Sequence, residues 1–168
     1  MVTSIIVAQQ EGLQTSYEAK LINSFRAMAV MGVGELTSGL TFGPLIDKLG
    51  SRCTAYIDVF IVGLQTAVAL ASVNSQEFGS LTFAMCFLLG FQDGATNIHL
   101  FQLLGSEFDS QAASFSVFNM LQGLSVFLFM IAQTFIDLHS LLQVSLYFTV
   151  CGLIGAVALL FSARFPHR

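Results

Sequence analysis

The chain has 168 residues, of which 55 % are hydrophobic and only 10 % are charged, and its formal net charge is −4. A soluble domain carries roughly a quarter charged residues, so this composition excludes an ordinary soluble globule. The acidic balance leaves no basic surface for a nucleic-acid partner. We therefore expect an integral membrane protein with the lipid bilayer as its solvent.

Residues 1–22 form an N-terminal segment that does not contain a complete span. Its apolar stretch MVTSIIVAQQ is shorter than the roughly 20 residues that cross a bilayer. It also lacks the basic start and the long apolar core of a signal peptide. We interpret the segment as the end of a preceding transmembrane helix, with a solvent-exposed arm as the alternative.

Residues 23–168 contain five apolar stretches that are long enough to span a bilayer. Short polar connections separate them, so each helix is expected to run antiparallel to the one before it. The predicted fold class is all-α, a polytopic membrane helix bundle of about five transmembrane helices. The predicted spans are about Ser24–Phe42, Cys53–Val73, Leu81–Gly105, Ala112–Phe135 and Leu141–Phe165.

The distribution of Lys and Arg near the span ends predicts the orientation of the chain. Cytosolic ends of transmembrane helices carry an excess of these residues. Lys20 and Arg26 lie on one side of the predicted arrangement, and four basic residues lie on the other side: Lys48, Arg52, Arg164 and Arg168. We expect the DKLGSR loop and the C-terminus to be cytosolic, in either the plasma membrane or an endomembrane.

Glu35 lies inside the first predicted span, beside three glycines. Gly32, Gly39 and Gly43 lie at nearby helix angles, and Gly39 and Gly43 form a GxxxG pair. Small residues on one face allow another helix to approach closely. We expect this face to point into the bundle, where Glu35 is either a hydrogen-bonded link between helices or an ion or proton site.

The third predicted span carries a polar arc in the stretch FQDGATNIHLFQ. At 100° per residue, two neighbouring stripes make up this arc. They consist of Gln92, Thr96 and His99 in one stripe and of Asp93 and Asn97 in the other. An acid at the centre of a membrane helix costs about 2.5–3.5 kcal/mol in insertion measurements. We therefore expect Asp93, Asn97 and His99 to face the bundle interior, on the side of a central cleft.

Three roles remain open for His99: hydrogen bonding between helices, proton relay and metal binding. No second His or Cys lies at ligand spacing, which disfavours a metal. Asn119 and Gln122 in the fourth span are candidate hydrogen-bonding partners of the polar arc. Asp58 follows Arg52 by only six residues, so we expect it to lie near the membrane surface.

The sequence contains no motif that predicts catalysis, a cofactor or a metal. It has no GxSxG, no HExxH, no phosphate-binding glycine loop and no Ser/His/Asp set with an expected common site. Cys53, Cys86 and Cys151 lie far apart, in or beside apolar runs and without a CxxC pair. We expect a protein without enzymatic activity, cofactor or bound metal.

The loop GPLIDKLGSR resembles the motif G-x-L-x-D-R/K-x-G-R/K-R/K, which joins consecutive helices in major facilitator transporters. Ser51 stands where the motif usually has a basic residue. The physical features suit a helix junction, with glycines for a turn and cations for the cytosolic surface. The residues that match the motif are Gly43, Leu45, Asp47, Lys48, Gly50 and Arg52.

Three further stretches resemble the C-terminal half of Unc-93-like proteins, an ion channel regulatory family related to the major facilitator superfamily. They are MGVGELTSGLTFG, LLGFQDGATNIHLFQLLG and SQAASFSVFNMLQGLSVFLFMIAQTF, in the order of the family. The resemblance covers nearly the whole chain after residue 22. The residues at its motif positions are Gly34, Glu35, Asp93, Asn97, His99, Phe115, Phe118 and Gln122, with His99 in place of a frequent Gln.

This resemblance implies a twelve-helix parent fold, of which the chain supplies helices eight to twelve. It also implies a partner, either an N-terminal half or another membrane protein. Two functions follow from it: an accessory subunit that regulates an ion channel or another membrane protein, or part of a secondary transporter for an ion or small solute. We favour the accessory role, because a transport pathway between two halves needs both of them.

Overall fold

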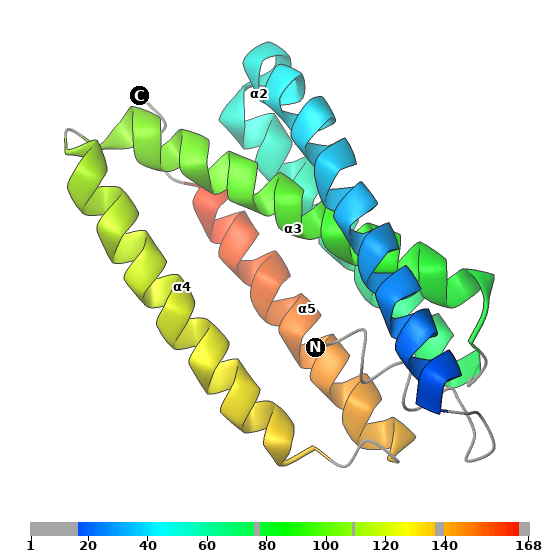
Figure 1. Ribbon diagram of the computed structural model, residues 1–168. Coiled ribbons are helices and arrows are strands. Elements are labelled where there is room, and N and C mark those ends of the chain that lie inside the picture. The colour runs from blue at the N-terminus through cyan, green and yellow to red at the C-terminus, as the bar shows by residue number, and fades with distance from the viewer. Residues whose placement is uncertain (1–16, 76–77, 109, 137–139, 165–168) are drawn as a thin grey trace.

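The computed structural model is all-helical, and it describes residues 17–75, 78–108, 110–136 and 140–164. Within these residues four helices follow one another: α2 (Tyr17–Ser75), α3 (Ser80–Glu107), α4 (Gln111–Thr134) and α5 (Leu141–Arg164). Helix α3 crosses α2, and α4 stands to one side of the other helices (Figure 1). The N-terminal segment proposed for residues 1–22 lies almost wholly outside the described residues.

Helix α2 is two helical arms joined at Gly50, whose backbone angles are φ 78° and ψ 161°. A straight helix of 59 residues would be about 90 Å long, three times the thickness of the hydrocarbon core. The chain instead reverses direction at the kink, and the second arm passes behind α3 (Figure 1). We call residues 17–49 the first arm and residues 51–75 the second arm.

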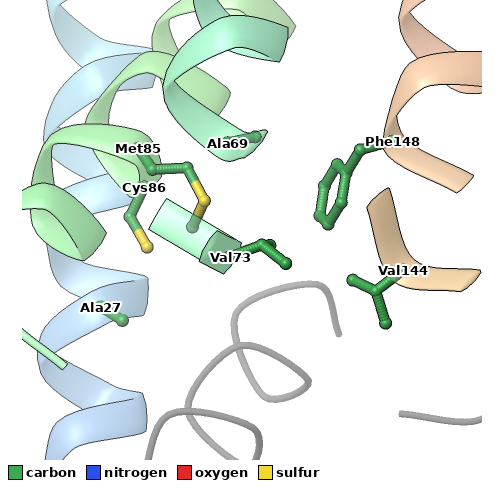
Figure 2. Close-up of a cluster of buried hydrophobic side chains, with 7 residues drawn as sticks. All are labelled: Ala27, Ala69, Val73, Met85, Cys86, Val144 and Phe148. Atoms are coloured by element: carbon green, nitrogen blue, oxygen red, sulfur yellow. The ribbon is translucent and has the colours of Figure 1, made fainter. Parts of the chain in front are cut away.

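The main hydrophobic core lies where both arms of α2 meet α3 and α5. In Figure 2, Val73 of the second arm lies between Met85 and Cys86 of α3 on one side and the α5 residues on the other. The buried residues of this cluster are Ala27, Ala69, Val73, Met85, Cys86, Val144 and Phe148. A second, smaller cluster of Phe42, Ile61 and Ala95 joins α2 to α3 closer to the kink.

Helix α4 contacts the rest of the described chain mainly through the end of α3. Phe101 of α3 makes ring contacts with Phe115 and Phe118 at centroid distances of 5.8 Å. The side-chain amide of Gln111 donates a hydrogen bond of 3.0 Å to the carbonyl oxygen of Gly105. None of the 24 residues of α4 is buried.

Three of the described helices are long and apolar enough to cross a membrane, namely α2, α4 and α5. This is fewer than the five predicted spans, for two reasons. The first two predicted stretches belong to the single kinked helix α2. The third predicted stretch is helix α3. Its polar arc lowers its mean hydropathy, so α3 is not among the three helices that are apolar enough to cross a membrane. The fourth and fifth predicted stretches agree with α4 and α5 to within one residue at each end.

Gly50 is the position where the fold requires glycine. Its φ and ψ lie in a region that only glycine adopts without strain, and side chains there cost about 1–3 kcal/mol. We expect Gly50→Ala to lower the free energy of unfolding by about that amount, measured as a lower midpoint of unfolding in SDS. Gly63→Ala is the matched control, because Gly63 is helical and a Cβ there meets no atom within 4 Å. Equal stability of the two variants would contradict this account of the kink.

Candidate functional site

Glycines bring the backbones of the first arm and α3 into direct contact. A Cβ atom on Gly90 would overlap the backbone of Met31, and one on Gly34 would overlap the backbone of Phe87. A Cβ on Gly94 would overlap the hydroxyl oxygen of Ser38. This approach is of the kind that small residues permit in membrane helix pairs, and it fixes the height at which α3 crosses the first arm.

Two acids meet at this crossing. Glu35 of the first arm and Asp93 of α3 lie close enough to interact electrostatically, although both residues are exposed on the surface of the described chain. Glu35 also lines a hollow of about 480 Å³ together with Leu36, Gly39 and Leu40.

A second polar cluster is buried on the other side of α3, against the second arm. His99 Nδ1 lies 2.7 Å from Asp58 Oδ2, and His99 Nε2 lies 2.9 Å from the hydroxyl oxygen of Ser51. Asp58 and His99 are each 1 % exposed, and Ser51 is half-buried. This chain of hydrogen bonds joins the residue after the kink to the interior of the helix pair.

The partners of His99 define which ring nitrogen carries its proton. A carboxylate oxygen only accepts, so Nδ1–H donates to Asp58. In the neutral imidazole Nε2 then accepts the hydrogen bond donated by the Ser51 hydroxyl. Asp58 Oδ1 is also buried and has no hydrogen-bond partner. The cluster therefore contains one carboxylate oxygen whose interaction is not satisfied by the described residues.

The polar groups continue along the second arm beyond Asp58. Gln65 is buried at 6 % exposure and lines a cavity of about 190 Å³ together with Gln92 of α3. Side chains of α5 complete the cavity wall, among them Tyr147, Phe148 and Cys151. The cavity has room for several water molecules. A polar seam thus runs between α2 and α3 from Ser51 to this cavity.

The structure divides the predicted polar arc between two opposite environments. Asp93 lies on the surface beside Glu35, whereas His99 is buried against the second arm. The three residues therefore do not share one environment, because His99 lies in the interior of the described bundle and Asp93 is exposed on it. Asn97 is half-buried. The reason is helix geometry, because Asp93 and His99 point about 120° apart on α3.

Asn119 and Gln122 do not pair with the polar arc. Both are exposed on α4, and His99 hydrogen-bonds to Asp58 and Ser51 instead. The glycine face predicted in the first span also differs from the face that packs. A Cβ on Gly32, Gly39 or Gly43 would meet no atom within 4 Å, whereas Gly34 contacts α3 directly.

Sequence reasoning missed Asp58 and Ser51. Asp58 was expected to lie near the membrane surface, and the structure shows in addition that it is buried against His99 of α3. One signal could have found both residues: Ser51, Asp58, Gln65 and Ser72 recur every seven residues and share one face of a helix. All four residues are buried or half-buried in the structure. A polar heptad in an apolar span marks a protein-facing side.

The loop-motif residues surround the kink. Asp47, Lys48, Gly50 and Arg52 are exposed, while Leu45 is half-buried among the residues of the smaller core cluster. Gly43 is helical, so the turn that the motif predicts is made by Gly50 alone. The motif therefore presents its charges at the reversal of the chain.

The prediction that no Ser/His/Asp set shares a site is also wrong. Ser51, His99 and Asp58 have the connectivity by which a base activates a serine hydroxyl. Nucleophilic catalysis needs in addition a substrate cleft and donors for an oxyanion. The cavities described above lie beside Gln65 and beside Glu35, away from Ser51. We interpret the three residues as a link between α2 and α3.

Comparisons with protein-family models, with curated proteins and with solved structures give no match for this chain.

The contact at Gly34 provides a test of the helix crossing. Gly34→Ala places a Cβ against the Phe87 backbone, which cannot move without displacing α3. Overpacking of this kind costs about 1–3 kcal/mol, so the midpoint of unfolding in SDS should fall. Gly39→Ala, five residues along the same arm in open space, is the matched control and should be tolerated. A stable Gly34→Ala protein would show that the two backbones are not in contact.

Proposed function

We propose that this chain is a non-catalytic, multi-pass membrane protein that acts as an accessory subunit and regulates an ion channel or another membrane protein. The resemblance to Unc-93-like proteins supports this proposal. The structural observation that carries it is α4, a helix of membrane-spanning length with no buried residue. Such a helix has an unused surface for a partner.

One face of α4 differs in chemistry from the rest of the helix. Residues recur on it in steps of three and four, and four of the six are small or polar: Ser116, Asn119, Gly123, Val126, Met130 and Gln133. The opposite face, at the same spacing, is purely apolar: Val117, Leu121, Leu124, Leu128 and Ile131. Small and polar residues are typical of contacts between membrane helices, so the first set is the proposed partner face. In the second set, Val117 and Leu121 line a hollow with Leu104 and Phe108, and Leu124 is open to lipid.

The amides near the middle of α4 strengthen this assignment. Asn119 and Gln122 are exposed, so in the absence of a partner they would meet lipid tails. Lipid offers no hydrogen bond, whereas amides between membrane helices contribute about 0.5–2 kcal/mol to association. The proposed partner is therefore a transmembrane helix that carries hydrogen-bonding side chains at the depth of these amides. This partner helix belongs either to an N-terminal half or to a separate membrane protein.

Photocross-linking from α4 tests the accessory role. A photoreactive residue in place of Asn119 should form an adduct with a protein in the native membrane, and one in place of Leu124 should react with lipid. Asn119→Leu should then lower the current or transport of the protein so identified, at unchanged amount in the membrane. Equal yields of protein adducts from both faces of α4 would contradict the proposal. So would an unchanged activity of the identified protein when Asn119→Leu is introduced.

The Glu35–Asp93 pair favours a second function, part of a major facilitator secondary transporter for an ion or small solute. Two neighbouring carboxyl groups beside an open hollow suit a proton-coupling site near the bilayer midplane. In this alternative the hollow would face the second half of the transporter. Acids inside membrane proteins commonly mark such pathways.

The two functions differ in their dependence on Asp93. Asp93→Asn preserves the shape of the side chain and removes its acidic proton. If the assembly transports, proton uptake into vesicles under an imposed membrane potential should fall to the level of protein-free vesicles. Asp47→Asn, which removes an exposed acid of the loop motif, is the control and should leave the uptake unchanged. Proton uptake that is insensitive to Asp93→Asn would exclude the transport role and leave the accessory role.

A further inference from the structure

Two buried oxygen atoms between α2 and α3 have no hydrogen-bond partner. They are Asp58 Oδ1 on the second arm and Thr96 Oγ1 on α3. Buried polar atoms are almost always satisfied, because each unsatisfied one costs about 1–3 kcal/mol and a charged one costs more. Water or a bound ion between the helices would satisfy such atoms.

The Thr96 hydroxyl differs from other helical threonine hydroxyls of this chain. Thr41, Thr66 and Thr149 each donate to the backbone carbonyl four residues earlier, at 2.7–2.9 Å. That bond satisfies a hydroxyl within its own helix. Thr96 makes no such bond, so its oxygen is free to interact across the helix pair.

The helix register places Thr96 opposite Asp58. The second arm and α3 run antiparallel, and His99 bonds to both Ser51 and Asp58, so it lies at a height between them. Thr96 precedes His99 by nearly one turn on the same side of α3, which brings it level with Asp58. Val62, one turn beyond Asp58, and Gln92, one turn from Thr96, line one cavity, which agrees with this register.

The chemistry of these atoms specifies the class of ligand. A carboxylate oxygen and a hydroxyl oxygen are hard donors, which suit hard cations. One carboxylate supplies a single negative charge, which a monovalent cation balances. The described residues hold no group of three or more His, Cys, Asp or Glu side chains that could bind a metal, so a transition-metal site is not available in them.

We propose that Asp58 Oδ1 and Thr96 Oγ1 bind an alkali-metal cation such as Na⁺ between α2 and α3. Asp58 is held in place by the hydrogen bond from His99, which occupies Oδ2 and turns Oδ1 toward the cation. Water would fill the remaining coordination positions. The bound cation then links the second arm to α3 close to the kink. This role is separate from the accessory function proposed for α4.

Direct binding of sodium-22 to the purified protein in detergent tests this site, at an ionic strength kept constant with choline chloride. The wild-type protein should bind the isotope saturably. Thr96→Val, which replaces the hydroxyl by a methyl group, should weaken the affinity about tenfold or more. Thr96→Ser keeps the hydroxyl and should retain binding, and Asp58→Asn should abolish it.

Thr41→Val is the matched control, because the Thr41 hydroxyl bonds to its own backbone and should not affect the cation. Absence of saturable sodium-22 binding to the folded wild-type protein would overturn the proposal and leave only water at these oxygens. Sodium binding that Thr96→Val does not weaken would overturn it as well. Both results would leave the accessory function of α4 untouched, since α4 contributes neither of the two oxygen atoms of the proposed site.

Discussion

Direct contact between the backbone of α3 and that of the first arm of α2 is the constraint on which both polar clusters depend. Helices normally keep their axes about 8–10 Å apart, at a distance set by the side chains between them. Gly34 and Gly90 remove those side chains where the helices cross. The Glu35–Asp93 pair can form because the crossing is close, and the opposite side of α3 is thereby turned toward the second arm.

The reversal at Gly50 then completes the arrangement around α3. It brings the second arm against the side of α3 that carries Thr96 and His99. Asp58 supplies the acceptor for the His99 ring at a position that is almost fully closed to solvent. An unpaired carboxylate in an apolar environment would destabilise this packing. The hydrogen-bond partners of Asp58 are therefore needed for the second arm to pack against α3. The polar seam is therefore part of the fold as well as a candidate site.

Much of this architecture follows from composition and hydrophobic length alone. The bounds of α4 and α5 agree with the sequence because their apolar runs end at clear polar segments. The first two spans were separable at DKLGSR, but the sharp reversal within that segment depends on the conformation of one glycine. The burial of Asp58 could not be read from its distance along the chain to Arg52, because that distance does not show which neighbouring helix covers the residue.

The candidate sites were harder to predict than the helices, for a reason that His99 and Asp93 illustrate. Both lie on one amphipathic helix, and sequence periodicity gives their angles around it without giving the directions of its neighbours. The two arms of α2 cover α3 from different sides, so the residues of one polar arc belong to two separate clusters. The same ambiguity explains the glycines of the first arm. Gly34 and Gly39 are equally small, and only the position of α3 distinguishes the one that packs.

The weak hydropathy of α3 has a consequence for how the chain enters the membrane during synthesis. A segment with an acid, an amide and a histidine near its centre partitions poorly from the translocon into lipid by itself. Its polar groups become acceptable only when the preceding hairpin is already present to receive them. If α3 crosses a membrane, its insertion is therefore expected to depend on α2, which receives its polar groups.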